Sequence, residues 1–420
     1  MLVMDLYVRR LVDPLIEELL DGFPAVLVVG PRGCGKTTTA ARHARTIVRL
    51  DREAEAAAVR ADPDGALEVP RPLLLDEWQV VPEVLAAVKR AVDSRPGPNN
   101  FLITGSVRSD LEAEGWPLTG RVLRVQMYGL IEREIKGAAT APPVLDRIAT
   151  AGTAAFSLPD DLPALNDYIT LALRGGFPEA VLAASDRLRR QWTSAYIEQL
   201  ITRDADMVDT GRDPARLRRY LHVLCLNTAG VVHANTLYES AGLNRKTALA
   251  YDKLLGNLLV VDTVPAWWSN RLKRLVQTAK RYVIDPGVVA ALLRLDVSGV
   301  RKDGDLLGRL LDTFVIAQLR AEATVSEAEP TLYHLRSEQG AREIDIIIEF
   351  ADGRVFGIEV KASSGPNRSD AKHLEWLRDE LGDRFIGGAV LHSGPRLYPL
   401  GERIVAAPIC SLWAPVPPKA

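Results

Sequence analysis

The chain has 420 residues, of which 47% are hydrophobic and 25% are charged, proportions typical of an ordinary soluble protein of about two to four domains. A formal net charge of -2 excludes a global attraction to nucleic acid, so any such surface has to be a local patch. Three cysteines, Cys34, Cys225 and Cys410, are too few and too scattered for a disulfide framework or a zinc site. The cysteines therefore favour a reducing compartment.

The start of the chain, Met1–Arg10, has no apolar core of signal-peptide length. No run of about 18 apolar residues, the length that a membrane-spanning helix needs, occurs anywhere in the sequence. We therefore expect a cytoplasmic protein that has no membrane partner.

The segment Gly30–Thr37 fits the phosphate-binding pattern G-x-x-x-x-G-K-[ST]. The apolar stretch Ala25–Val29 before it predicts a buried strand, and Thr38–Ala44 after it predicts a helix, which a glycine-rich turn with a surface lysine would not require. Backbone N–H groups of such a loop wrap phosphates, and the helix N-terminus adds partial positive charge. The residues predicted to bind the nucleotide are Gly30, Pro31, Arg32, Gly33, Cys34, Gly35, Lys36, Thr37 and Thr38. Lys36 is expected at the outer phosphates and Thr37 at Mg²⁺.

Four more strand-like segments follow, at residues 46–50, 72–75, 101–104 and 121–125, and helical stretches such as Pro82–Val92 separate most of them. This alternation predicts an α/β fold with a parallel sheet and helices on both faces. Ligands of such sheets bind at the carboxyl ends of the strands. The polar residues that fall at these ends are Asp51, Asp76, Glu77, Thr104 and Ser106.

The pair Asp76-Glu77 ends the strand at residues 72–75. Phosphoryl transfer needs a metal to neutralise charge and a group to orient the nucleophile. We expect Asp76 to hold Mg²⁺, through water, and Glu77 to polarise the attacking water, so that Glu77 and Lys36 are catalytic. An acidic pair alone is more often a helix cap, but its position after the phosphate-loop strand favours ATPases with an added central strand and a catalytic glutamate.

Two further roles remain open at this stage. Thr104 or Ser106 is expected either to sense the γ-phosphate by a hydrogen bond or to cap the next helix. Arg121 or its competitor Arg108 contacts the phosphates, in its own subunit or in a neighbouring one. The second case requires a homo-oligomer, a dimer or a ring.

The chain resembles the bacterial and archaeal AAA-type ATPases that carry an uncharacterised C-terminal domain. The matching segments are Gly30–Thr37, Leu73–Gln79, Leu102–Ser106, Leu118–Arg121, Arg174–Glu179, Lys280–Gly287 and Gly357–Ala362. The resemblance implies an ATP-binding core, a winged-helix segment and a C-terminal fold similar to PD-(D/E)xK nucleases. The chain departs from the family at residues 136–165, which look like a variable insertion or linker, and at Asp312–Val315, where the family usually has Glu-Asn-Phe-Val.

Residues 215–285 have the cadence of a helix-turn-helix, with helices at residues 236–243 and 244–255 and a hairpin of residues 258–261 with 281–284. A basic, aromatic segment lies between the two strands and is suited to phosphate contacts and base stacking. The candidate nucleic-acid contacts are Arg245, Lys246, Arg271, Lys273, Arg274 and Lys280. The alternative is a winged helix that packs between domains. The turn at residues 174–178 is open to a structural or a functional interpretation.

Two strands, Glu343–Ile348 and Val355–Lys361, are expected to form a hairpin in the C-terminal region. Strand alternation places Glu359 and Lys361 on one face, where Asp345 can converge with them. Two carboxylates would bind Mg²⁺, and Lys361 would polarise the water or stabilise the pentavalent phosphate, with Asp312, Glu338 and Gln339 as further contributors. The alternative is a retired nuclease fold that serves as a binding module.

We thus expect four regions: an AAA-type P-loop ATPase core (1–135), a linker and helical region (136–210), a winged-helix-like domain (211–290) and a PD-(D/E)xK-like domain, similar to restriction endonucleases (300–420). The predicted function is Mg²⁺-dependent ATP hydrolysis coupled to movement of the winged-helix and nuclease-like domains. The alternatives are an ATP-controlled DNA-binding or nuclease protein, and a nucleotide-dependent switch on another protein in a toxin–antitoxin or defence setting.

Overall fold

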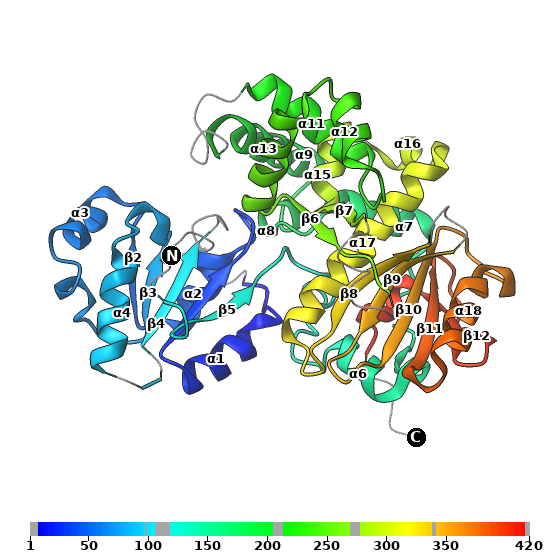
Figure 1. Cartoon of the computed structure of the whole chain (residues 1–420), viewed down its shortest axis with the longest axis horizontal. Coiled ribbons are helices and arrows are strands. Elements are labelled where there is room, and N and C mark those ends of the chain that lie inside the picture. Colours follow the sequence, from blue (N-terminus) through cyan, green and yellow to red (C-terminus); the bar gives the residue numbers. More distant parts are fainter. Residues whose placement is uncertain are drawn as a thin grey trace. The chain divides into compact units, whose positions relative to one another are not determined.

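The computed structural model of the chain describes residues 7–95, 97–98, 100–105, 118–204, 213–268, 278–337 and 342–415. These residues form two compact units (Figure 1). The first unit holds the described residues up to Leu130 and the short segment Leu255–Val260, and the second holds Ile131–Leu254 and the described residues from Val261 onward. Within these ranges no helix is both long enough and apolar enough to cross a membrane.

A five-stranded parallel sheet, in the order β2-β3-β4-β1-β5, forms the centre of the first unit. Its strands are β1 (Ala25–Val29), β2 (Thr46–Arg49), β3 (Leu73–Asp76), β4 (Phe101–Gly105) and β5 (Leu123–Gln126). The predicted parallel sheet is thereby confirmed. Strand β4 lies between β1 and β3, so it is the added central strand that the order of the motifs indicates.

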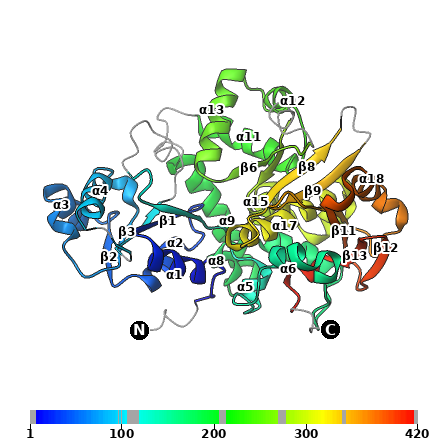
Figure 2. The same cartoon turned by 60° about the horizontal axis from the view of Figure 1, so that its bottom comes forward.

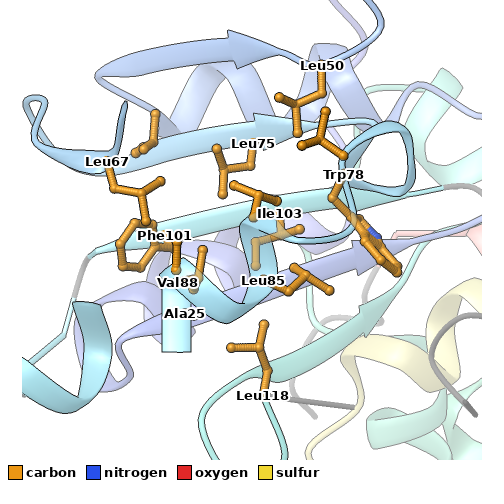
Figure 3. Packing of buried hydrophobic residues seen from close by; sticks show 14 of the residues in the cluster. Ala25, Leu50, Leu67, Leu75, Trp78, Leu85, Val88, Phe101, Ile103 and Leu118 are labelled. Atoms are coloured by element: carbon orange, nitrogen blue, oxygen red, sulfur yellow. The ribbon is translucent and has the colours of Figure 1, made fainter. Parts of the chain in front are cut away.

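Helices pack against both faces of this sheet, which explains why its strands are continuous apolar runs. The helices are α1 (Val12–Gly22), α2 (Lys36–His43), α3 (Glu53–Ala61) and α4 (Val84–Ser94). Alternate residues of the strands, such as Leu75 and Ile103, join one core with Leu85 and Val88 of α4 (Figure 3). Helices α1 and α2 contact β1 from the remaining side. This packing holds the strand ends, and with them the site, in a rigid layer.

The second unit begins with short helices and includes a helix-turn-helix. Its helices are α5 (Glu132–Ile135), α6 (Val144–Ala151), α7 (Leu165–Arg174), α8 (Pro178–Val181), α9 (Asp186–Gln199), α11 (Pro214–Leu226), α12 (Ala234–Ser240), α13 (Arg245–Asn257), α15 (Pro286–Leu293), α16 (Val297–Lys302), α17 (Gly304–Val325) and α18 (Lys372–Leu381). Residues 136–165, expected as an insertion or linker, instead contain α6. Because Val144, Leu145 and Ile148 of α6 are fully buried, this segment belongs to the packed core.

The predicted hairpin follows the helix-turn-helix, but its first strand comes later in the chain than expected. Strand β6 spans Val261–Val264 and pairs antiparallel with β7 (Lys280–Val283), with Val264 opposite Lys280. The expected start at residue 258 fails because α13 continues to Asn257 and Leu259 then takes a left-handed backbone conformation, with φ of 56°.

A six-stranded mixed sheet, in the order β12-β13-β11-β10-β9-β8, forms the C-terminal part of the second unit (Figure 2). The strands are β8 (Thr331–Arg336), β9 (Glu343–Glu349), β10 (Val355–Lys361), β11 (Phe385–His392), β12 (Tyr398–Gly401) and β13 (Ile404–Pro408). Strands β8, β9 and β10 are antiparallel neighbours, whereas β10, β11 and β13 run parallel. The hairpin of β9 and β10 has the bounds that the sequence predicts, to within one residue.

The turn after α7 is held by a buried aspartate. Asp285 caps α15, and its carboxylate accepts hydrogen bonds of 2.7 Å from the backbone N–H groups of Gly176 and Gly287. Gly175 has φ of +70°, and a Cβ atom there would lie 2.3 Å from Oδ1 of Asp285. Arg174 forms an ion pair with the buried Glu132. These contacts support the structural interpretation of the glycine-rich turn.

Replacing Asp285 with alanine should destabilise the second unit, because two buried N–H groups lose their acceptor. We expect a loss of roughly 2–4 kcal/mol, measured by chemical denaturation. The matched control is Asp296→Ala, which removes an exposed cap that accepts from the N–H of Gly299 at 2.6 Å. Its expected loss is about 1 kcal/mol, and equal losses in the two variants would contradict the special role of Asp285.

Candidate functional site

The segment Gly30–Thr37 forms a loop between β1 and α2, at the carboxyl end of the strand. The Lys36 side chain turns back over this loop, where its Nζ atom donates hydrogen bonds of 3.0 Å to the carbonyls of Gly30 and Pro31. Gly33 and Gly35 take left-handed φ angles of 77° and 95°, which favour glycine. The loop backbone therefore has the curvature by which successive N–H groups bind phosphate.

One carboxylate oxygen joins two strand ends of the first unit to the first turn of α2. Oδ1 of Asp76 accepts a hydrogen bond of 2.8 Å from the hydroxyl of Thr37 and one of 2.5 Å from the hydroxyl of Thr104. Asp76 is 4% exposed and Thr104 is fully buried, so neither group exchanges this partner for bulk water. Hydroxyl and carboxylate oxygens are the hard ligands that Mg²⁺ prefers. The pair Thr37 and Asp76 therefore fits a magnesium ion.

Glu77 directly follows Asp76, and its backbone takes the left-handed conformation with φ of 57°. Its N–H donates to Oγ1 of Thr104 at 3.4 Å, and its carboxylate accepts a hydrogen bond from the amide of Gln79. Gln79 is a contact that the sequence did not reveal as functional, although it ends one of the segments that carry the family resemblance. The chain thus fixes one oxygen of the expected catalytic glutamate.

The back of the phosphate loop is held by Arg10, another residue without a sequence signal. Its guanidinium is buried and donates hydrogen bonds to the carbonyls of Cys34 at 2.8 Å and Tyr128 at 2.7 Å. Gly30 packs on the same segment, where a Cβ atom would lie 2.3 Å from the carbonyl oxygen of Met127. The segment after β5 and the phosphate loop are therefore locked together.

The structure does not bring Arg121 to the phosphate loop of its own chain. Arg121 precedes β5, and Val26 near the start of β1 pairs with Leu123, so Arg121 lies at the edge of the sheet opposite the loop. Its guanidinium forms an ion pair of 2.6 Å with Asp93. The prediction that Arg121 contacts phosphate in its own subunit is thereby corrected. A contact in a neighbouring subunit stays a prediction. Ser106 and Arg108 lie outside the described residues.

The candidate nucleic-acid contacts divide into three groups. Arg245 and Lys246 are exposed at the start of α13, where contact with DNA stays a prediction. Arg271, Lys273 and Arg274 lie outside the described residues. The prediction that Lys280 contacts nucleic acid is corrected, because this residue is only 2% exposed and pairs with carboxylates of its own chain.

The residues of the expected nuclease-like site come together in the second unit. Asp345 and Glu359 are neighbours on the antiparallel pair β9 and β10, one step along the register from Ile346 and Ile358. The ammonium of Lys361 lies 3.2 Å from Oε2 of Glu359. One oxygen of Asp345 accepts a hydrogen bond of 2.9 Å from the backbone N–H of Val360.

Protein cations and donors, however, surround these carboxylates. Lys280 from β7 bonds to Asp312 of α17 and lies 3.3 Å from Asp345, while the Tyr282 hydroxyl donates to Asp312 at 3.0 Å. His373 of α18 lies 3.8 Å from Glu359. In the part of the chain that the structure describes, no group of three or more His, Cys, Asp or Glu side chains is arranged to hold a metal ion.

Burial and neighbouring charge shift the pKa values of these carboxylates. Burial and the charge of Asp345 raise the pKa of Glu359 to about 7. Burial likewise raises the pKa of Asp312 to about 6, although the charge of Lys280 opposes the increase. Burial opposes the ionisation of Asp345 too, but Lys280 and the N–H of Val360 lower its pKa below the ordinary value.

Models of known protein families match three parts of the chain. Residues 22–136 match the model of an AAA domain, and this range contains the phosphate loop together with Asp76, Glu77 and Thr104. The first unit is therefore similar to AAA domains, and this similarity supports the P-loop ATPase interpretation. Residues 165–299 and 307–412 match two domains of unknown function, DUF8612 and DUF4143. The nuclease-like interpretation of the C-terminal region gains no support from these matches.

Two mycobacterial proteins are similar to the chain over most of its length. They are the uncharacterized protein Rv2008c of Mycobacterium tuberculosis and the uncharacterized protein Mb2031c of Mycobacterium bovis. Each is 29% identical over 406 residues, which cover 95% of this chain and 83% of the relative. The Walker-type ATPase paby2304 of Pyrococcus abyssi superposes with a TM-score of 0.41 and 14% identity, over 67% of this chain and 94% of that one. The similarity of the first unit to AAA domains rests on the match of residues 22–136 alone.

The raised pKa of Glu359 predicts how stability changes with pH. Because the folded protein binds this proton up to about pH 7 and the unfolded chain releases it near 4.5, stability should fall as the pH rises between these values. Glu359→Gln mimics the protonated carboxyl and should reduce this fall by roughly 2–3 kcal/mol. The measurement compares unfolding of the variant and wild type at pH 5 and pH 8. Glu380→Gln, at an exposed position of α18, is the control and should leave the pH dependence unchanged.

Proposed function

We propose that the first unit binds ATP with Mg²⁺ and hydrolyses it. The observation that carries this proposal is the hydrogen-bonded group Thr37–Asp76–Thr104 next to the phosphate loop. It joins the helix after β1 to the carboxyl ends of β3 and β4, where ligands of parallel sheets bind. The match of residues 22–136 to an AAA domain supports the same function.

Each residue of the group has a separate task in this proposal. Lys36 and the loop N–H groups bind the phosphates, and Thr37 and Asp76 hold Mg²⁺. Bound Mg²⁺ supplies positive charge that neutralises the charge developing on the phosphate oxygens. Glu77 orients the attacking water and accepts its proton. Thr104, fully buried beside Asp76, links the metal ligand to the backbone of Glu77.

The path of the chain supports a coupling of this cycle to the second unit. The chain leaves the first unit after Leu130, returns to it for Leu255–Val260 and leaves again at Val261. The returning segment contains the end of α13 and directly precedes β6. A nucleotide-dependent change in the first unit would therefore act on the helix-turn-helix and on the hairpin through covalent connections.

Two substitutions separate binding from hydrolysis. Lys36→Ala should abolish ATP binding, because the loop loses its phosphate-binding cation. Glu77→Gln should bind ATP normally and lower kcat by roughly 10²–10⁴-fold, since an amide accepts no proton from water. The measurements are fluorescent-nucleotide binding and steady-state phosphate release. Wild-type protein that neither binds nor hydrolyses ATP, with Mg²⁺ present, would contradict the proposal.

Gln79 should act as a positioning residue for Glu77. Gln79→Ala removes the hydrogen bond to the glutamate carboxylate and leaves every proposed phosphate and metal ligand in place. We expect kcat to fall by about 10-fold to 100-fold while the Kd for ATP stays unchanged. Gln191→Ala, at an exposed position of α9, is the control for loss of a glutamine elsewhere. An unchanged kcat in Gln79→Ala would show that the pair has no part in hydrolysis.

A further inference from the structure

A lysine of the hairpin lies among the acidic residues of the C-terminal region. The Lys280 side chain is 2% exposed, and its ammonium contacts the carboxylates of Asp312 and Asp345. Tyr282, two positions further along β7, donates to the second oxygen of Asp312. Strand β7, helix α17 and strand β9 therefore meet at a single positive charge.

The positive charge of Lys280 compensates the negative charges of the two carboxylates. Neighbouring carboxylates repel each other, and the buried Asp312 and the half-buried Asp345 are both ionised only where a cation compensates them. Burial alone would lower the pKa of Lys280, but the charge of Asp312 first, and that of Asp345 as well, raise it well above the ordinary value. The lysine is thus held in the charged form by the same carboxylates that it neutralises.

The adjacent carboxylate also has basic side chains as neighbours. Glu359 has the ammonium of Lys361 at 3.2 Å and the ring of His373 at 3.8 Å. Together the three carboxylates of this cluster contact two lysines and a histidine. A divalent cation is attracted to carboxylates whose charge is not already balanced, and this cluster supplies its own balance.

We propose that the Lys280 ammonium is the built-in cation of this acid cluster and that a divalent metal ion binds Asp312 and Asp345 only when this ammonium is removed. The native C-terminal region then does not act as a metal-dependent nuclease. The hairpin of β6 and β7, and not the six-stranded sheet, controls the access of a metal ion to the two acids. Lys280 is the first residue of β7 and pairs with Val264 of β6.

The test is a count of bound Mn²⁺ per chain, by electron paramagnetic resonance, in four full-length proteins without nucleotide. They are wild type, Asp345→Asn, Lys280→Gln and the double variant Lys280→Gln/Asp345→Asn. All four keep the phosphate-loop residues, so any Mn²⁺ bound there contributes equally. We expect equal counts in wild type and Asp345→Asn, one additional Mn²⁺ in Lys280→Gln, and loss of this ion in the double variant.

Two results would overturn the proposal. One is a wild-type protein that binds an Mn²⁺ ion, or cleaves DNA with Mn²⁺, in a manner that Asp345→Asn abolishes. The other is a folded Lys280→Gln protein that gains no metal ion. Should Lys280→Gln fail to fold, the comparison of wild type with Asp345→Asn decides by itself, since equal counts support the built-in cation and a difference refutes it.

Discussion

The candidate ATPase site depends on a single buried oxygen, Oδ1 of Asp76, which accepts hydrogen bonds from Thr37 and Thr104. These bonds tie the first turn of α2 to the ends of β3 and β4. Because the oxygen is shielded from water, its partners are fixed by the sheet and not by solvent. The first turn of α2, Asp76, Thr104 and the backbone of Glu77 thus form one connected group, and a displacement of either strand would alter all of them.

In the second unit, too, polar groups that are shielded from water need partners within the chain, and there the groups carry full charges. Four of its acids, the buried Glu132, Asp312 and Glu359 and the half-buried Asp345, each have a cation of the same chain as a partner. Asp285 is satisfied instead by backbone N–H groups. Burying an unpaired carboxylate is strongly unfavourable, so these pairings decide how the helices and the sheet of this unit pack together. They also connect residues that are distant in sequence: Gly175 leaves space for Asp285, and Lys280 reaches Asp345.

Local patterns predicted much of the first unit. The five strands, their parallel arrangement, and the placement of Asp76 and Thr104 at strand ends all follow from apolar runs with polar residues after them, whereas the order of the strands comes from the structure. The hairpin of β9 and β10 was equally visible from its turn and alternation. The start of β6 was not, because the left-handed turn at Leu259 falls on a residue with no glycine signal. The ion pair of Arg121 with Asp93 was not visible either, because a motif does not reveal at which end of the strands an arginine lies.

The amino-acid sequence by itself determined that this protein has a phosphate loop, an acidic pair after a neighbouring strand and an α/β core around them, since these features depend on spacing within short segments. Only the tertiary structure decided which side chains are paired. It placed Gln79 on Glu77, Arg10 behind the phosphate loop and Lys280 between two acids. Such pairings join strands and helices that are distant in sequence, and burial makes them strong. No local pattern encodes the partner that a buried charge will have.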